Sequence, residues 1–209
     1  MEDAERKITF AQMKFFQMWY SRQKQETQDN VKKLVKNGQI EFANGGWTGS
    51  DEACPNYEDL YNNMLIGHQF LQNEFGRTPS VGWHLDSFGH SSTNARLFAD
   101  LGFEAMFVAR HDKSEQKVRD KMKSYEFLWR PNSANFGNQK QILTSIFRDG
   151  YCFVPGFKQE DDNIDDDKTL RSFNAEQKMR TLINYIHNKL VPTHQGNHIL
   201  LPWGCDFHF

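Results

Sequence analysis

The residues that could do chemistry are concentrated in one short stretch, residues 82–91, which reads Gly-Trp-His-Leu-Asp-Ser-Phe-Gly-His-Ser. It brings a carboxylate, two imidazoles, hydroxyl groups and an aromatic ring close together in the chain. The apolar run at 81–85 predicts a short buried strand, and Ser91 is typical of a residue that caps a helix. We therefore expect Asp86 at the carboxyl end of a strand, where α/β enzymes carry catalytic side chains.

A second aspartate, Asp206, follows the apolar run 199–203, which predicts a last strand. Ligands gather beyond the carboxyl ends of parallel strands, so we expect Asp86 and Asp206 to project into one cleft. Most glycosidases use two carboxylates that flank the bond to be cleaved, and in retaining enzymes these carboxylates lie about 5–5.5 Å apart. Taken singly, Asp86 could instead cap a helix and Asp206 could be a solvated residue.

The elements that must position these residues follow from the spacing of apolar positions and from capping residues. Three predicted strands separated by two helices form a parallel βαβαβ unit in the first half of the chain, because crossovers of that length return each strand in the same direction. The fold class is therefore α/β. Helices are expected over 10–20, 25–36, 57–75, 91–102 and 173–190, and strands over 39–43, 81–85, 103–108, 125–129, 142–147 and 199–203.

Composition excludes several function classes. The chain has 209 residues, of which 38% are hydrophobic, which is enough to bury the core of one domain. A formal charge of -2 gives no basic surface for nucleic acid, and we find no membrane segment and no signal peptide in the sequence. Three cysteines (Cys54, Cys152 and Cys205) leave at least one unpaired and do not fix the redox compartment. The sequence contains no pattern that indicates an oligomeric state.

The stretch 82–91 resembles the nucleophile motif of the glycoside hydrolase family 38 α-mannosidases, most closely the lysosomal type, which has a small residue before its acid. Five further segments match the family in order, so the resemblance covers nearly the whole chain. They are 42–47 (Phe-Ala-Asn-Gly-Gly-Trp), 50–53 (Ser-Asp-Glu-Ala), 67–71 (Gly-His-Gln-Phe-Leu), 95–98 (Ala-Arg-Leu-Phe) and 204–207 (Gly-Cys-Asp-Phe). The resemblance implies that residues 1–209 are an internal part of the N-terminal catalytic domain, a parallel β/α barrel-like domain that we expect to be incomplete at both ends.

The resemblance also assigns roles, residue by residue. Asp86 is similar to the family's nucleophile, which also binds zinc, and Asp206 is similar to its general acid/base. Phe88 matches an aromatic that lines the sugar site, and Arg110 matches an arginine beside the nucleophile. These roles imply retaining hydrolysis of terminal α-linked mannose from glycans.

Trp47 follows a pair of glycines, Gly45-Gly46, that could be mistaken for a phosphate-binding loop. The pair lacks the Lys-Ser/Thr that follows in a P-loop and the spaced third glycine of a dinucleotide site. We interpret it as a tight turn that places Trp47 near the cleft, as a substrate-binding residue.

The zinc ion that the resemblance implies needs three ligands besides Asp86, an upstream His-x-Asp pair and a downstream histidine, none of which is in this sequence. One carboxylate cannot hold zinc tightly, so we expect no meaningful mannosidase activity from the isolated chain. His84 and His90 are more typical of hydrogen-bonded structural residues, and we assign neither to zinc.

The expected partner is a mannose-containing oligosaccharide or N-glycan, and the resemblance implies the lumen of a lysosome or vacuole. Two alternatives remain open. The chain could be a catalytically inactive remnant with at most weak carbohydrate binding. It could also be a metal-dependent sugar deacetylase, which would use a His-x-x-x-His pair such as His194 and His198 close to an aspartate.

Overall fold

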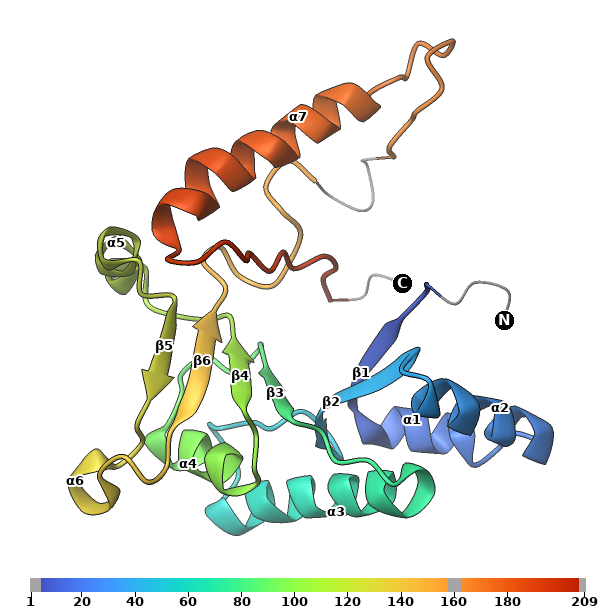
Figure 1. Cartoon of the computed structure of the whole chain (residues 1–209), viewed down its shortest axis with the longest axis vertical. Coiled ribbons are helices and arrows are strands. Elements are labelled where there is room, and N and C mark those ends of the chain that lie inside the picture. The colour runs from blue at the N-terminus through green and yellow to red at the C-terminus, as the bar shows by residue number, and fades with distance from the viewer. Residues whose placement is uncertain (1–4, 158–162, 207–209) are drawn as a thin grey trace. The chain divides into compact units, whose positions relative to one another are not determined.

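The computed structural model of the chain describes residues 5–157 and 163–206 (Figure 1). It divides into two compact units. The first comprises Met1–Val108 and Leu128–Thr144, and the second comprises Ala109–Phe127 and Ser145–Phe209. Over the described ranges, no helix combines the length and the apolar character needed to cross a membrane.

The first unit opens with a strand where a helix was expected. β1 (Ile8–Gln12) precedes α1 (Met13–Tyr20), so the prediction of one continuous helix from residue 10 is wrong. β1 pairs in parallel with β2 (Ile40–Gly46), and Phe10 lies opposite Phe42. A partner strand 32 positions further along the chain therefore overrides the local helical spacing.

The next two helices end where their C-terminal glycines predict. α2 (Gln25–Lys36) is followed by Asn37 and a left-handed Gly38, and α3 (Tyr57–Phe75) ends at a left-handed Gly76. α3 begins with a capping box between Asn56 and Asp59. Buried side chains of α1, α2, β2 and α3 form one apolar core in this unit, comprising Met13, Phe16, Tyr20, Val31, Val35, Phe42 and Leu71.

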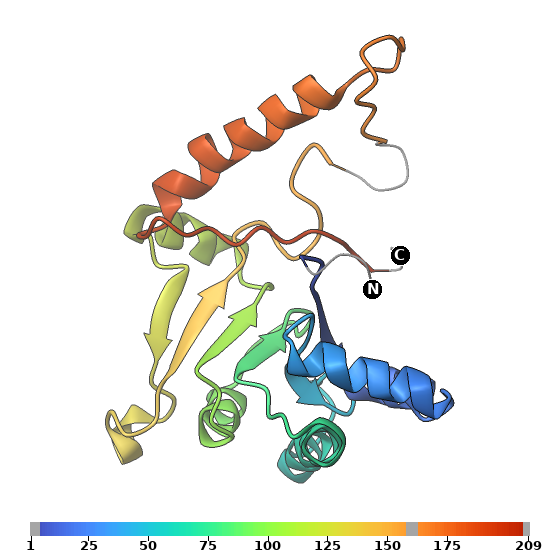
Figure 2. The same cartoon turned by 45° about the vertical axis from the view of Figure 1, so that its right-hand side comes forward.

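A second sheet carries the stretch of candidate residues. β3 (Val81–His84) and β4 (Ala105–Val108) pair in parallel, joined by α4 (Ser92–Asp100), as predicted. A side chain at Gly82 would approach the Phe98 ring to 2.8 Å, so the glycine lets α4 pack closely on β3. The strand order of this sheet is β3-β4-β6-β5, with the strands side by side in Figures 1 and 2.

The described strands form two open sheets, so the barrel-like closure expected from the resemblance is not present in this part of the chain. β2 pairs with β1 and does not extend the sheet of β3. At the end of β2, Asn44 has a positive φ of 56°, and its side-chain Oδ1 accepts a hydrogen bond from the backbone N–H of Trp83 at 3.3 Å. A side-chain contact therefore occupies the N–H that a backbone ladder would use.

The sheet is completed by two strands that were predicted from their apolar runs. They are β5 (Glu126–Trp129) and β6 (Ile142–Ile146), with α6 (Ser133–Phe136) between them. The arrows in Figure 1 show β5 running opposite to β6, so this sheet is mixed.

The second unit contains α5 (Lys113–Met122) and α7 (Ala175–Tyr185). α7 continues through a π-helical turn, Ile186–Leu190, into a 3-10 turn, Val191–Thr193, which together agree with the long helix predicted over 173–190. Arg148 anchors the segment after β6 to α5, because its Nη2 lies 2.8 Å from Asp120 Oδ2.

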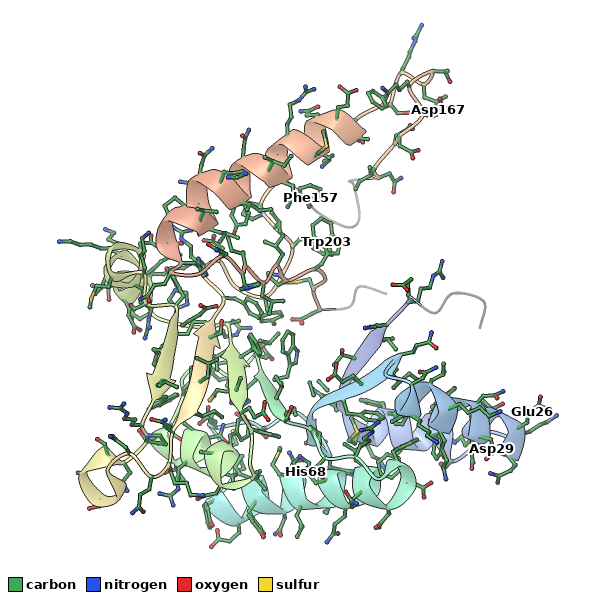
Figure 3. All side chains as sticks on the ribbon, viewed as in Figure 1. Glu26, Asp29, His68, Phe157, Asp167 and Trp203 are labelled. Carbon is green, nitrogen blue, oxygen red and sulfur yellow. A yellow bond between two sulfur atoms is a disulfide. The ribbon has the colours of Figure 1, made fainter. Side chains whose placement is uncertain are left out.

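The last predicted strand, over 199–203, is absent, since this segment joins neither of the two sheets. Pro202 has no N–H to donate to a ladder, and Leu200 and Trp203 leave about half of their surface exposed. The Trp203 ring packs against Phe157 with ring centres 4.9 Å apart (Figure 3). The apolar residues of this run therefore serve local packing.

Candidate functional site

Asp86 lies in the loop directly after β3, as predicted. Its side chain is exposed, and the neighbouring Phe88 is 73% exposed. Two side-chain contacts fasten the loop to the chain after β2: the Ser87 hydroxyl donates to the Ser50 carbonyl at 3.1 Å, and the Ser91 N–H donates to Glu52 Oε1 at 2.8 Å. The loop therefore presents Asp86 and Phe88 at the surface from a fastened backbone.

The loop ends in the helix cap that the sequence predicts. The Ser91 hydroxyl accepts a hydrogen bond from the Asn94 N–H at 3.0 Å, at the first turn of α4. This contact satisfies one of the backbone donors that a helix start leaves without a partner. Both ends of the candidate loop are thus set by regular structure, by β3 on one side and by α4 on the other.

The two histidines of the stretch converge on one buried carboxylate. His84 Nε2 lies 2.9 Å from Glu52 Oε2, and His90 Nδ1 lies 3.4 Å from the same oxygen. Burial raises the pKa of Glu52, but hydrogen bonds from His84, His90 and Ser91 outweigh burial and hold this pKa well below its usual range. Glu52 is therefore an anion at neutral pH inside a pocket of donors.

These three side chains are the one group of at least three potential metal ligands in the described part of the chain, and their ligand atoms all lie within 4.8 Å of one another. Asp86 belongs to no such group there. The residues that the structure describes around Asp86 therefore do not by themselves fit the zinc site that the sequence resemblance implies, because a structural or catalytic zinc needs three or four protein ligands.

Gly45 has a positive φ of 76°, but Gly45 and Gly46 are the last two residues of β2, so the tight turn predicted there is instead the end of a strand, and Trp47 begins the bend that follows it. The Trp47 ring is half-buried and packs edge-on against Phe70 of α3, with ring centres 6.3 Å apart. Lys14 Nζ lies 5.1 Å from the centre of the Trp47 ring. Trp47 thus contributes to the core of the first unit, and its role in substrate binding stays a prediction.

Asp206, Arg110 and a tyrosine that the sequence did not single out come together in the second unit. The Tyr151 hydroxyl lies 3.2 Å from Asp206 Oδ2, and Arg110 Nη2 donates to the same hydroxyl at 3.4 Å. The Arg110 guanidinium also lies 5.7 Å from the centre of the Tyr151 ring. Asp206 is exposed, and its carboxylate is thus held by a hydroxyl that a cation supports.

A disulfide joins the two segments of the chain that carry this contact. It joins Cys152, the neighbour of Tyr151, to Cys205, the neighbour of Asp206. The cross-link therefore keeps Tyr151 and Asp206 within reach of each other although no sheet positions Asp206. The remaining cysteine, Cys54, is exposed and reduced.

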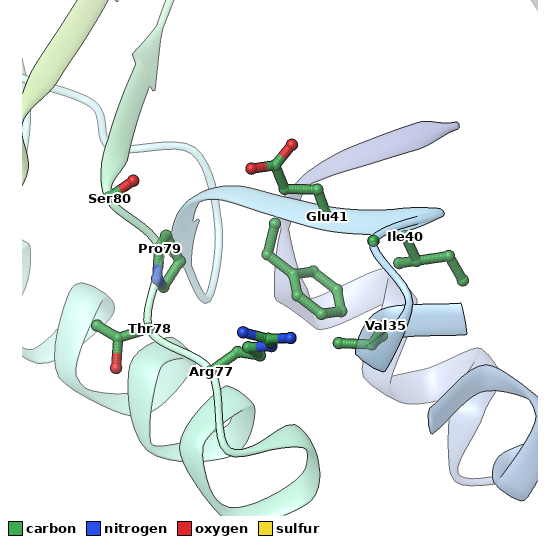
Figure 4. A pocket seen from close by; sticks show the side chains of 9 residues that line it. Val35, Ile40, Glu41, Arg77, Thr78, Pro79 and Ser80 are labelled. Carbon is green, nitrogen blue, oxygen red and sulfur yellow. The ribbon is translucent and has the colours of Figure 1, made fainter. Parts of the chain in front are cut away.

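A cavity of about 290 Å³ lies in the first unit, away from the candidate loop (Figure 4). Its lining residues come from the end of α2, from β2 and from the segment before β3; they are Val35, Gly38, Ile40, Glu41, Phe42, Arg77, Thr78, Pro79 and Ser80. Arg77 reaches toward α2, where its Nη2 lies 3.5 Å from the Lys36 carbonyl. The cavity adjoins the amino end of β3, whereas Asp86 follows the carboxyl end.

The histidine pair of the deacetylase alternative has other partners. His194 Nδ1 donates to the Leu190 carbonyl at 2.8 Å, and its ring stacks on Tyr125 with centres 5.4 Å apart. His198 is exposed. Among the described residues neither belongs to a group of three potential ligands, so nothing favours a metal site there.

Two contact residues were missed from the sequence. Glu52 lies in a matched segment, 50–53, but its partners are more than thirty positions away, so no local pattern indicates their contact. Tyr151 had one usable signal, because it adjoins a cysteine just as Asp206 does. A disulfide between Cys152 and Cys205 would have predicted the pairing of their neighbours.

Comparison with known proteins places the chain in a family. The family model described as "Glycosyl hydrolases family 38 N-terminal domain" matches residues 1–209. The lysosomal alpha-mannosidase of Dictyostelium discoideum is 40% identical over 215 residues, covering 100% of this chain and 21% of the relative. The alpha-mannosidase of Canavalia ensiformis is 37% identical over 212 residues, covering 99% and 21%. The chain thus spans about a fifth of the length of these curated relatives.

Among solved structures, the crystal structure of an alpha-mannosidase from Enterococcus faecalis V583 has a TM-score of 0.66 with this chain at 19% identity. It covers 99% of this chain and 21% of that protein, and it shows a shared fold. The match of the family model over all 209 residues, supported by relatives at 34–40% identity, establishes the family. The chain belongs to the glycosyl hydrolase family 38 N-terminal domain family.

Proposed function

We propose that this chain carries the two reacting carboxylates of a retaining α-mannosidase, with Asp86 as nucleophile and Asp206 as acid/base. The observation that carries the proposal is the Tyr151–Asp206–Arg110 contact within a family 38 domain. A hydroxyl and a guanidinium orient the carboxylate that must exchange a proton, while Asp86 stands on a fastened loop after β3.

The reaction needs two steps. In the first, an Asp86 oxygen attacks the anomeric carbon of a terminal α-linked mannose while Asp206 donates a proton to the leaving glycosidic oxygen. In the second, Asp206 takes a proton from a water molecule that attacks the same carbon. The bond between this carbon and the Asp86 oxygen breaks, which frees the mannose and restores the Asp86 carboxylate. Retaining chemistry requires the two carboxylates to lie about 5–5.5 Å apart, so their convergence in one cleft remains a prediction of the proposal.

Arg110 and Phe88 complete the proposed site. Phe88 offers an exposed ring on which the apolar face of a sugar can pack. The Arg110 cation supports Tyr151, whose hydroxyl holds the Asp206 carboxylate. No step is assigned to zinc, because the described residues around Asp86 do not provide its ligand set.

The proposed substrate is a mannose-containing oligosaccharide or N-glycan, and the proposed compartment is the lumen of a lysosome or vacuole. Relatives named lysosomal alpha-mannosidase in Dictyostelium discoideum and Mus musculus support both. The Cys152–Cys205 disulfide also favours an oxidising compartment over the cytosol.

The proposal can be tested by a chimera in which residues 1–209 replace the matched segment of the Dictyostelium relative. We expect hydrolysis of an aryl α-mannoside, and a loss of at least about 10³-fold in kcat for Asp86→Asn and for Asp206→Asn. A fluorinated mannosyl inactivator should leave a covalent sugar on the peptide that contains Asp86, detectable by mass spectrometry.

Asp112→Asn is the matched control, because Asp112 is an exposed aspartate that caps α5 and should leave kcat unchanged. A folded chimera without hydrolysis, or one in which Asp86→Asn keeps full activity, would contradict the proposal and favour a non-catalytic role. The isolated chain should show no robust hydrolysis, with or without added zinc.

A further inference from the structure

The Glu52, His84 and His90 side chains present a donor set with the chemistry of a zinc ligand group. Zinc is bound in proteins by imidazole nitrogens and carboxylate oxygens, at about 2.0–2.2 Å. Two imidazoles and one carboxylate also suit other late first-row divalent ions, whereas calcium and magnesium prefer sites made of oxygen atoms. The donor atoms of the group therefore favour zinc and similar divalent ions over calcium and magnesium.

The spacing of the donors fits one ion. Tetrahedral bonds of about 2.0 Å place neighbouring donor atoms about 3.3 Å apart. The separations from Glu52 Oε2 are 2.9 Å to His84 Nε2 and 3.4 Å to His90 Nδ1, and all the donor atoms of the group lie within 4.8 Å of one another. The separations are thus within about 1.5 Å of those that one tetrahedral ion requires, so small side-chain shifts would bring the three donors onto a single ion.

The three side chains are held in place from separate parts of the first unit. Glu52 lies on the connection between β2 and α3, His84 closes β3, and His90 ends the loop before α4. The second carboxylate oxygen of Glu52 accepts the Ser91 N–H at 2.8 Å, and the His84 ring packs edge-on against Phe98. Such outer contacts fix the orientation of metal ligands and raise affinity.

Access to the group is one-sided. The side chains of His84 and Glu52 are 3% and 8% exposed, whereas that of His90 is 15% exposed. A divalent ion can therefore enter past His90 and be shielded by the other two ligands, with its fourth position open to water.

We propose that Glu52, His84 and His90 form a binding site for one divalent zinc-class ion, with a water molecule as fourth ligand. This site excludes Asp86 and so differs from the zinc site that the family resemblance implies. It goes beyond the proposed function and does not depend on hydrolysis by Asp86 and Asp206. An ion there fastens the loop that carries Asp86 and Phe88 to the chain after β2.

The test uses the 209-residue chain with Cys54→Ser, which removes the one reduced cysteine as a competing ligand. After removal of metal by a chelator, titration calorimetry with Zn²⁺ should give one saturable site, and Ca²⁺ and Mg²⁺ should give none. Co²⁺ should produce the intense visible absorption of a tetrahedral complex. Zinc-edge X-ray absorption should report two imidazole nitrogens.

Glu52→Gln, His84→Asn and His90→Asn should each weaken Zn²⁺ binding by at least about 10-fold, since even outer-contact changes cost 10–100-fold at metal sites. The matched controls Asp86→Asn and His187→Asn should keep the wild-type affinity, because neither residue belongs to the group. Circular dichroism confirms folding of each variant. If Glu52→Gln or His84→Asn fails to fold, the Zn²⁺ affinity of His90→Asn and the spectra of the wild-type chain still test the proposal.

Three results would overturn the proposal. One is the absence of saturable Zn²⁺ binding by the wild-type chain. Another is an absorption spectrum without imidazole ligands. The third is loss of zinc on Asp86→Asn together with unchanged affinity in His90→Asn, which would place the ion at Asp86 instead. None of these results bears on the carboxylate roles, which the chimera tests separately.

Discussion

The Tyr151 hydroxyl lies 3.2 Å from Asp206 Oδ2, in a part of the chain where no strand positions the aspartate. Arg110 donates to the same hydroxyl, so the tyrosine links a cation to a carboxylate. Its neighbour Cys152 is bonded to Cys205, the neighbour of Asp206. Hydrogen bonding and covalent linkage thus take over the positioning that a sheet would otherwise provide.

Tyr151→Phe in the chimera should lower kcat about 10-fold, because it removes a hydrogen bond to a carboxylate, a contact worth about 1.5 kcal/mol at its lower limit. The thermal midpoint should change little, since Asp206 is exposed. Steady-state kinetics on an aryl α-mannoside measures the effect. Tyr57→Phe, at an exposed tyrosine, is the control. Equal kcat in both variants would show that Tyr151 does not serve the reaction.

Cys205→Ser should destabilise the second unit. The disulfide closes a loop with a sequence separation of 53, and the chain-entropy model gives about 4 kcal/mol for a loop of that length. Urea unfolding followed by fluorescence should show a lower midpoint for Cys205→Ser and for the reduced wild type alike. Cys54→Ser, which breaks no cross-link, should keep the wild-type midpoint. An unchanged midpoint for Cys205→Ser would refute the expectation.

Gly67→Ala should destabilise the first unit although alanine favours helices by about 1 kcal/mol over glycine. A Cβ at Gly67 of α3 would overlap the carbonyl oxygen of Gly45 and lie 2.8 Å from the Trp47 nitrogen, and these are backbone atoms that cannot move aside. Thermal unfolding should show a loss of at least about 1–3 kcal/mol, the usual cost of overpacking. Gln69→Ala, at an exposed position of the same helix, is the control and should be near neutral.

His68 should make the stability of the first unit depend on pH. Burial lowers the pKa of His68, and its hydrogen bond to the Asn44 carbonyl at 2.8 Å offsets this only in part. The folded pKa therefore lies below the unfolded value of about 6.5. The unfolded state binds more protons, so the free energy of unfolding falls as the pH drops from about 7 through 6.5 and levels off below the folded pKa.

His68→Gln removes this titrating group and should flatten the pH dependence of unfolding in that window. Urea titrations at a series of pH values measure the slope. His187→Gln, at an exposed histidine, should retain the wild-type slope. The expectation fails if His68→Gln and the wild type lose stability in parallel as the medium is acidified.

The elements that the sequence predicts correctly are those fixed by local chemistry. α2 and α3 each end at a glycine with a positive φ, and β3, α4 and β4 alternate with the spacing of a βαβ unit. β1 was missed because its strand character comes from its pairing with β2. The strand predicted over 199–203 was wrong because apolar residues alone do not supply the ladder partners, and Pro202 removes a donor.

In the candidate site, too, the sequence predicts what local signals determine and misses contacts between distant segments. Asp86 was placed correctly after β3 because a strand and a helix cap frame it within ten residues. The convergence of Glu52 with His84 and His90 depends on how the connection after β2 folds over β3, which only the three-dimensional structure reveals. The interpretation of the histidines as hydrogen-bonded residues agrees with the contact between His84 and Glu52, and only the structure reveals the carboxylate that makes the three side chains a potential ligand group.

The Cys152–Cys205 bond makes a covalent ring of the chain between the two cysteines, and α7 lies within it. A protease that cuts once inside the ring cannot release a piece, because the two new ends stay attached through the sulfur atoms. A nicked molecule would therefore keep its mass on a non-reducing gel and split into fragments only after treatment with a thiol. A single cut within the ring would therefore leave Asp206 tethered to Tyr151.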